Sequence, residues 1–478
     1  MKICILVEGS YPYVTGGVAS WVQMLIQSMP EHDFIIYSIG AEEKSRGQFK
    51  YKLPDNVLGI YENFLDSILA LKNPPPGKYR LSSAEIENLS ILINGGKGLD
   101  FNLLLKTVRL SNNSKNPLDI FMSFEFFDAI KLGYKQGFAQ LPFTDFFWTV
   151  RSMLLPLFYI LKQDLPEADI YHSVATGYAG VIGSLATTLY NRPLLLTEHG
   201  IYSREREEEI IKCSWAKGDF KNLWINFFYS LAEIAYQKST QVFTLFTKNL
   251  ETQVELGCDP NKIRVIPNAI NIKLFQDIPR RDIADPYLNV GAIVRVVPIK
   301  DIITMLRSFA IVKQKVANAK FYIMGGIDEN EEYYQECLRI VESLEIQDVV
   351  FTGSVNIREY LGKMDLLVLT SISEGQPLAI LEGLAAKKPF VATDVGCCKE
   401  LLYGDDDDLG HAGIVASVMD YESIARAIVK LAQNEALRQE MGENGYARIA
   451  RYHVFEDFIN KYKAVYKEVK ENYGRYRV

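Results

Sequence analysis

The sequence lacks the cysteine spacing of a zinc site or of a disulfide scaffold. Its 478 residues contain six cysteines, with no Cys-x-x-Cys pair and no regular framework. We therefore expect no metal site, and a reducing, cytoplasmic environment fits this cysteine content best.

Long apolar runs are missing as well. The nearest approach, Met153–Leu161, is about half of the roughly 18 residues that a membrane span requires, and Pro156 interrupts it. Residues Met1–Val7 have the pattern of a buried strand and lack the basic and long apolar regions of a signal peptide. We expect that the chain does not span a membrane.

An excess of positive charge, which nucleic-acid proteins usually carry, is also absent. The 59 Asp and Glu residues outnumber the 52 Lys and Arg residues, and the formal net charge is −7. This balance argues against a surface built to neutralise nucleic-acid phosphates. Apolar residues make up 48% of the chain, which is typical of a globular protein, and two or three domains are expected at this length.

What the chain does contain is two similar series of strands, loops and helices. The first series opens with Lys2–Val7, the loop Glu8–Gly17 and the helix-like segment Val18–Met29. This alternation is typical of doubly wound parallel sheets in α/β proteins. The further strands expected in the first series are Ile170–Tyr171, Leu194–Thr197 and Val242–Leu245, and those in the second are Leu288–Val294, Lys320–Met324, Val349–Thr352, Leu366–Thr370 and Phe390–Thr393.

Breaks in this alternation predict the domain boundaries. We expect one α/β domain at residues 1–280, a second at 285–452, and a final helical segment at 453–478 that crosses back to the first domain. Residues from about 42 to 163 have the pattern of a helical insertion rich in phenylalanine. Its aromatic side chains either pack internally or form an apolar face that docks a partner at a membrane.

The strongest group of candidate site residues follows the expected strand Leu366–Thr370. The stretch Ser373–Glu382 forms a loop and opens a helix, so free backbone N–H groups and a positive dipole end lie at a strand end. A diphosphate suits such a place, and Gly375 allows close approach of the backbone. Glu374 and Glu382 cannot bind phosphate, and we expect them to accept hydroxyl groups of a donor sugar and of a ribose. The alternative is an acidic first turn that only stabilises the helix.

Two cations follow the first strand of the second series. Arg295 and Lys300 come after Leu288–Val294, at the carboxyl end where open α/β sheets bind ligands. Two cations at this place would neutralise a diphosphate leaving group. Each of them taken alone is more typical of a solvated loop.

These motifs together resemble glycosyltransferase family 4. The resemblance covers residues 285–450 and implies the GT-B fold, in which two Rossmann-like domains with doubly wound parallel sheets face each other across a cleft. It also implies a retaining reaction, a diphosphate role for the two cations, and sugar and ribose roles for the two glutamates. The motifs that carry it are Arg295 with Lys300, Phe351–Gly353, Asp365–Leu369 with Ser371, Glu374 with Glu382, and Ala392–Gly396. We therefore assign three further residues of these motifs to the donor site, Gly353, Gln376 and Leu378.

The first domain extends the resemblance. Gly16 and Gly17 look like the glycine loop that faces the donor phosphates in this family, and the alternative is an ordinary tight turn. His199 ends an expected strand, where the family places a histidine near the reacting sugar, although a lone histidine is usually structural. We assign His199 a catalytic role together with Glu374, Arg295 and Lys300.

Two features depart from the family pattern. Asp301 follows Lys300 at a position where the family usually has glycine. The acidic run Asp405–Asp408 is expected to be a solvated turn, because four consecutive side chains cannot converge on one metal ion.

A narrower resemblance is to the cytoplasmic glycosyltransferases of Pel-type exopolysaccharide synthesis. It rests on Tyr11–Gly17, Thr197–Arg206 and the long insertion. It implies a UDP-sugar donor, either UDP-glucose or a UDP-N-acetylhexosamine, and a carbohydrate acceptor. It also implies work beside a membrane-embedded polysaccharide synthase complex, with the protein peripheral at the inner face of the membrane.

The expected reaction needs no obligatory cofactor or metal. Arg295, Lys300 and the helix N-terminus already balance the diphosphate, and no Asp-x-Asp motif ends a strand. The absence of a placed carboxylate nucleophile favours front-face displacement, in which the departing diphosphate oxygen helps to deprotonate the acceptor. The alternatives are a sugar-nucleotide epimerase of GT-B fold and a non-catalytic sugar-nucleotide-binding scaffold, whereas a dehydrogenase would need a Gly-x-Gly-x-x-Gly motif after a strand.

Overall fold

The computed structural model describes residues 1–72, 80–110, 116–278, 285–405 and 407–472. The chain folds into two compact units, one formed by Met1–Val265 with the residues from Tyr462 onward, and the other by Ile266–Lys461. The helix α18 (Phe455–Asn472) therefore begins in the second unit and ends in the first. The boundary was expected between residues 280 and 285, whereas the two compact units divide between Val265 and Ile266.

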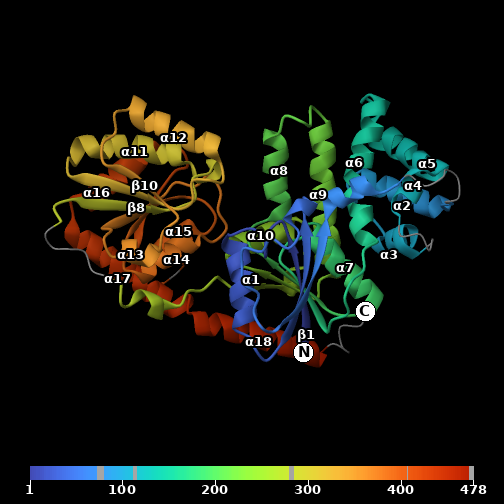
Figure 1. The fold of residues 1–478 in the computed structure, drawn as a ribbon, viewed down its shortest axis with the longest axis horizontal. Helices are drawn as coiled ribbons and strands as arrows, with labels where there is room; N and C mark the ends of the chain where they lie inside the picture. The colour runs from blue at the N-terminus through green and yellow to red at the C-terminus, as the bar shows by residue number, and fades with distance from the viewer. Residues whose placement is uncertain (73–79, 111–115, 279–284, 406, 473–478) are drawn as a thin grey trace. The chain divides into compact units, whose positions relative to one another are not determined.

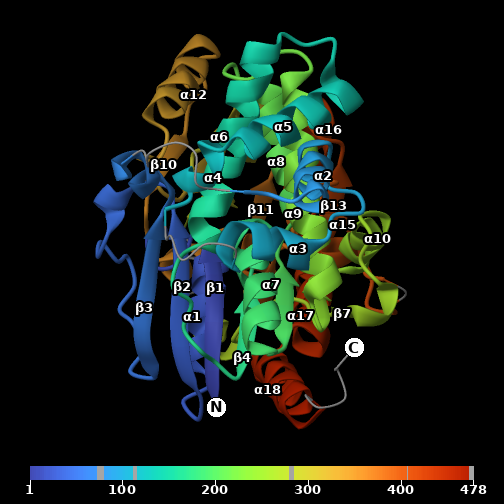
Figure 2. The same cartoon turned by 90° about the vertical axis from the view of Figure 1, so that its right-hand side faces the viewer.

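The first unit is built around a parallel sheet that has seven strands among the described residues, in the order β3-β2-β1-β4-β5-β6-β7. The central strands β4 and β5 are buried along their whole length, as expected for parallel strands covered on both faces. In Figure 2, α7 lies against β1 and β4, which it contacts. The strands are β1 (Lys2–Glu8), β2 (Asp33–Gly40), β3 (Val57–Phe64), β4 (Ile170–Ser173), β5 (Leu194–Glu198), β6 (Gln241–Thr244) and β7 (Ile263–Val265), and the helices near the sheet are α1 (Gly17–Gln27), α7 (Tyr178–Tyr190), α8 (Tyr202–Lys212), α9 (Phe220–Lys238) and α10 (Thr247–Glu255).

A helical layer covers part of this unit (Figure 1). Its phenylalanines pack on one another and on α7, so internal packing accounts for most of the aromatic content of the segment. The predicted insertion at 42–163 also contains β3, so the helical part starts only after residue 64. The helices are α2 (Ser83–Ile93), α3 (Phe101–Leu105), α4 (Leu118–Phe121), α5 (Phe124–Gly133) and α6 (Phe143–Leu161).

The second unit repeats the same architecture. Its parallel sheet has six strands within the described part of the chain, in the order β10-β9-β8-β11-β12-β13. The strands are β8 (Leu288–Ile293), β9 (Ala319–Met324), β10 (Val349–Gly353), β11 (Leu366–Leu369), β12 (Phe390–Thr393) and β13 (Gly413–Ala416), and the helices are α11 (Ile302–Lys315), α12 (Glu331–Ser343), α13 (Ile357–Leu361), α14 (Leu378–Ala385), α15 (Cys398–Tyr403), α16 (Tyr421–Ala432) and α17 (Glu435–Tyr452). The α/β fold class with two doubly wound parallel sheets is thereby confirmed.

The acidic run at Asp405–Asp408 differs from its prediction. Asp407 forms a buried, two-pronged ion pair with Arg448 of α17, with N–O distances of 2.7 and 2.8 Å. This hydrogen-bonded guanidinium holds the pKa of Asp407 below its usual range. The solvated-turn prediction is therefore wrong for Asp407, while Asp406 lies outside the described residues.

Candidate active site

In the second unit, the structure brings Lys300 and Glu374 together. The Lys300 ammonium forms an ion pair with the Glu374 carboxylate, and the Ser371 hydroxyl donates to the same carboxylate at 2.6 Å. The Lys300 and Glu374 side chains are only 19% and 11% exposed. The expected diphosphate cation and the expected sugar-binding carboxylate therefore neutralise each other.

Hydrogen bonds between side chains and the backbone hold this pair in place. The Thr370 hydroxyl donates to the carbonyls of Lys300 and Asp301, at 3.0 Å each. Asp301 has a φ of 47° and caps α11 through a hydrogen bond from the Thr304 N–H at 3.2 Å. Aspartate tolerates this left-handed conformation better than most residues, so Asp301 can stand where the family usually has glycine.

The loop that carries Glu374 is packed against a glycine that was not among the assigned site residues. Gly396 has a φ of 53°, and a Cβ atom there would lie 2.2 Å from the Gly375 carbonyl oxygen and 2.3 Å from that of Glu374. The Cys397 N–H donates to the Gly375 carbonyl at 3.1 Å. The close approach requires glycine at position 396, which is where the Ala392–Gly396 motif ends.

Of the other residues assigned to this loop, Gln376 is buried and already bonded. Its side-chain oxygen accepts the Asn268 N–H at 2.6 Å, which makes it an anchor of the loop. Leu378 begins α14, and Glu382 lies one turn further on the same helix. Burial raises the pKa of Glu382 to about 7, so this carboxyl group titrates near neutral pH.

Arg295 and Gly353 lie elsewhere on the same sheet edge. Arg295 is paired with Glu329, with both N–O distances at 2.5 Å, and is not part of the Lys300–Glu374 pair. Gly353 ends β10 with a φ of 67°, and its carbonyl accepts the Gly325 N–H at 3.0 Å. A Cβ at Gly325 would lie 2.0 Å from the Val294 carbonyl oxygen, so Gly325 is a second structural glycine that the motifs missed.

In the first unit, Gly16 and Gly17 precede and open α1. Gly16 has an extended backbone with a φ of 174°, and a Cβ atom added at either position would meet nothing within 4 Å among the described residues. Neither close packing nor a left-handed φ therefore requires glycine here. The structure leaves the space beside both residues open.

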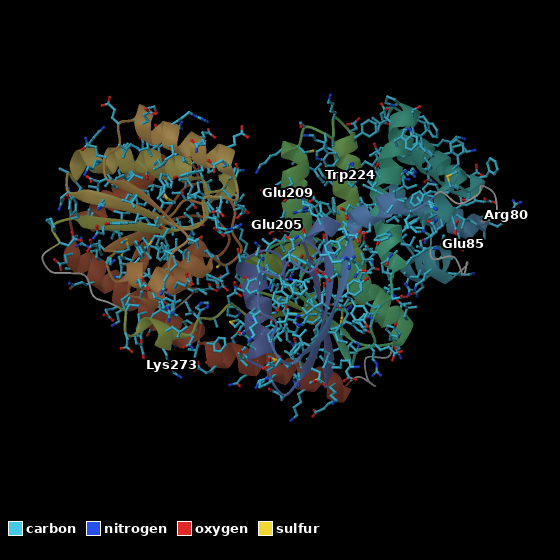
Figure 3. All side chains as sticks on the ribbon, viewed as in Figure 1. Arg80, Glu85, Glu205, Glu209, Trp224 and Lys273 are labelled. Carbon is cyan, nitrogen blue, oxygen red and sulfur yellow. The ribbon has the colours of Figure 1, made fainter. Side chains whose placement is uncertain are left out.

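His199 follows β5 directly. Its Nε2 atom is buried and has no hydrogen-bond partner within the described part of the chain. Burial lowers the pKa of His199 to about 4, so the imidazole is neutral at physiological pH. Figure 3 shows Glu205 and Glu209 along α8, the helix that starts three residues after His199.

Two carboxylates near the start of α8 were not predicted, Glu8, which is partly buried, and Glu198, which is buried. Glu8, at the end of β1, accepts hydrogen bonds from the Tyr202 hydroxyl at 2.6 Å and from the Ala179 N–H at 3.2 Å. Burial raises the pKa values of both Glu8 and Glu198, and hydrogen bonds partly offset the shift. The donors to Glu198 are the Tyr236 hydroxyl, the Gln253 amide, the Thr176 hydroxyl and the Tyr202 N–H. These contacts fix the start of α8 relative to the sheet.

Several known proteins are similar to this chain in sequence or in structure. N-acetyl-alpha-D-glucosaminyl L-malate synthase of Bacillus anthracis is 28% identical over 173 residues, which cover 36% of this chain and 43% of that protein. The capsular polysaccharide biosynthesis glycosyltransferase CapM of Staphylococcus aureus is 24% identical over 66% of this chain and 83% of its own length. The structure of HepE from Anabaena in complex with UDP-glucose matches 98% of this chain and 100% of that chain, with a TM-score of 0.61 and 14% identity.

Residues 287–434 match the family described as "Glycosyl transferases group 1". Together with the two parallel-sheet units, this match defines the structural class of the chain as that of GT-B glycosyltransferases. The chain belongs to the family described as "Domain of unknown function (DUF3492)", which matches residues 1–261, more than half of its length. Among the described helices, none is long and apolar enough to cross a membrane.

Proposed function

We propose that this protein is a retaining glycosyltransferase that transfers a sugar from a UDP-sugar to a growing polysaccharide. The observation that carries the proposal is the Lys300–Glu374–Ser371 cluster beside the N-terminus of α14, with Glu382 one turn along that helix. A cation and free helix N–H groups suit a diphosphate, and carboxylates suit sugar hydroxyls.

The ion pair suggests how the donor would bind. A diphosphate carries more negative charge than one carboxylate, so it would take the Lys300 ammonium from Glu374. Glu374 would then be free to accept a sugar hydroxyl, with Ser371 still donating to it. Charge formed on the leaving diphosphate would be stabilised by Lys300 and by the helix N-terminus.

His199 has the properties of a neutral contact to the reacting sugar. Its lowered pKa keeps the imidazole uncharged, and its buried Nε2 atom is available for a hydrogen bond. With Gly16 and Gly17 it supplies the first unit's part of the proposed reaction. We propose donor contacts for Gly353, Gly375 and Leu378, and a positioning role for Gln376.

The proposed identities of the donor and the acceptor rest on the similarity of this chain to other proteins. The structure of HepE contains UDP-glucose, which supports UDP-glucose or a UDP-N-acetylhexosamine as the donor. The name of CapM refers to capsular polysaccharide biosynthesis, which supports a polysaccharide acceptor. The sequence resembles PelF, so we propose Pel-like exopolysaccharide biosynthesis in the cytoplasm as the setting.

Exposed aromatic side chains support a membrane-embedded synthase complex as partner. Phe124 of α5 is 81% exposed and Trp148 of α6 is 55% exposed, although the segment buries most of its other aromatic rings. Phe124→Asp with Trp148→Asp should abolish co-purification with such a complex and leave donor binding unchanged.

Donor turnover with and without acceptor tests the proposal. A glycosyltransferase releases UDP and elongates the acceptor, and the anomeric configuration of the product reports retention. An epimerase would form UDP and an altered sugar without any acceptor, and a scaffold would bind the donor without turnover. A binding screen of UDP-glucose, UDP-N-acetylglucosamine, UDP-N-acetylgalactosamine and a GDP-sugar would identify the donor.

A further inference from the structure

Trp21 joins two features of the first unit that are far apart in the sequence. It lies on α1, one turn after Gly17, and is only 3% exposed. Its indole meets the His199 imidazole edge to face, with ring centroids 4.8 Å apart and an interplanar angle of 78°. This is a favoured geometry for aromatic pairs.

Trp21 also contacts a buried polar cluster. His172 of β4 hydrogen-bonds through Nδ1 to the Tyr466 hydroxyl at 2.7 Å and through Nε2 to the Thr197 hydroxyl at 2.8 Å. The Thr197 hydroxyl also lies 3.2 Å from that of Tyr462. Trp21 contacts both His172 and Tyr462 edge to face, at centroid distances of 5.9 and 5.4 Å.

These contacts leave Trp21 with little freedom. Its neighbours in this cluster come from β4 and α18, and both ring nitrogens of His172 are hydrogen-bonded, which restrains the rings around it. His199 differs, because its Nε2 atom has no hydrogen-bond partner among the described residues. Packing against Trp21 therefore restrains the plane of the His199 ring.

We propose that Trp21 is a positioning residue, which holds the His199 imidazole at the angle that the reacting sugar requires. This role rests on the proposed function, since it matters for turnover only if His199 contacts the sugar. The tyrosines of α18 act through Trp21, so the end of the chain helps to order His199.

The experiment compares Trp21→Leu with wild type in two readouts. The first is the His199 imidazole pKa by NMR with labelled histidine, which is simple to assign because the chain has five histidines and His199→Gln removes one signal. Loss of the indole should admit water, and the pKa should rise by about one unit from its value near 4. His172, whose charge would affect His199, is followed in the same spectra.

The second readout is kinetic. Trp21→Leu should lower kcat about fivefold, less than the loss expected when His199 itself is removed, with UDP affinity changed less than about twofold, because misplacement rather than lost binding is expected. Trp21→Phe retains an aromatic edge and should recover much of the rate, and it serves as the test if Trp21→Leu does not fold. Trp215→Leu, which alters an exposed tryptophan of the same unit, should change neither readout.

An unchanged His199 pKa and chemical shift in Trp21→Leu, or in Trp21→Phe if only that variant folds, would overturn the positioning role. A shifted pKa with no detectable transfer by the wild-type protein would instead overturn the proposed function and leave the structural role of Trp21 standing. A shifted pKa with an unaltered kcat would show that the orientation of His199 does not matter for turnover, which also overturns the proposal.

Discussion

The carboxyl ends of the two parallel sheets carry different kinds of polar groups. In the second unit, Lys300 and Glu374 are charged, partly exposed and paired with each other. In the first, His199 and His172 are neutral, with their pKa values lowered to about 4 and about 3; His172 is buried and His199 is partly buried. Both sheets are parallel and doubly wound, so the difference in charge and burial comes from the side chains at their carboxyl ends.

The charged pair and the neutral histidines are suited to two different tasks, binding an anion and holding side chains in a fixed geometry. A charged pair can exchange one partner for an incoming anion at modest cost, because the ligand replaces the charge that it displaces. A neutral buried cluster cannot exchange partners without leaving polar atoms unsatisfied, so it maintains geometry instead. The second unit is suited to binding a diphosphate, and the first to orienting uncharged hydroxyl groups.

The largest effect is expected from the charged pair. Lys300→Ala should weaken UDP binding by about 2 to 3 kcal/mol, since it removes a charged hydrogen-bond donor and leaves Glu374 to repel the diphosphate. Glu374→Gln should strengthen UDP binding, because it frees Lys300, and should nevertheless abolish transfer. Calorimetry with UDP measures both.

Lys313→Ala provides the control for the charged pair, because Lys313 forms a similar ion pair with Asp348 elsewhere in the same unit. It should leave UDP affinity unchanged. Equal UDP affinities for wild type and Lys300→Ala would show that the diphosphate binds elsewhere.

Glycine substitutions should affect the two units differently. Gly396→Ala should lower the free energy of unfolding by about 2 kcal/mol, because its Cβ would overlap the Glu374 and Gly375 carbonyls at a left-handed φ. Gly17→Ala should change it by less than about 0.5 kcal/mol, since the space beside Gly17 is open. Urea unfolding measures both, and a strongly destabilised Gly17→Ala would indicate a packing role that the structure does not show.

Replacing His199 should alter turnover more than donor binding. His199→Ala should lower kcat about tenfold, while UDP affinity stays within about twofold, because the imidazole is expected to meet the sugar and not the nucleotide. His411→Ala, in the second unit, is the matched control. A fully active His199→Ala enzyme would return this histidine to a structural role.

The smallest expected effect is a pH dependence. Burial raises the pKa of Glu382 to about 7, so free protein holds this carboxyl partly protonated near neutral pH. A ribose hydroxyl would donate to the carboxylate form, so binding lowers the pKa and releases a proton. UDP affinity should rise about fivefold between pH 6 and pH 8 and level off above. Glu382→Gln should remove this dependence, and a pH-independent wild type would refute the ribose role.

The sequence predicted the groups that lie close together along the chain. Glu374, Ser371 and Glu382 fall within one strand, loop and helix, so their proximity follows from local structure. The contact of His172 with Tyr466 joins residues 294 positions apart, and no local pattern indicates it. The pairing of Arg295 with Glu329 is likewise a tertiary contact.

Four described strands were missed: β2, which the apolar run Phe34–Tyr37 could have indicated, and three strands at sheet edges, β3, β7 and β13. The edge strands have a physical explanation. β3 lies at the edge of its sheet, is mostly half-exposed and contains Gly59, so it lacks a continuous apolar run. β13 also lies at the edge of its sheet and has only four residues, two of them half-buried. Central strands such as β5 are wholly buried and were recognised from their apolar runs.

The hydrogen bond between Asn268 and Gln376, in the loop that carries Glu374, affects the design of chimeras between this protein and its relatives. The Asn268 N–H binds Gln376, its carbonyl oxygen lies 2.8 Å from His453 Nδ1, and Ile270 forms a β-bridge with Val454. Residues 266–271 and 453–461 therefore belong to the second unit as firmly as its own strands. A chimera that exchanged only residues 285–452 would separate this loop from its buried anchor, whereas one that exchanged residues 266–461 would transfer both together.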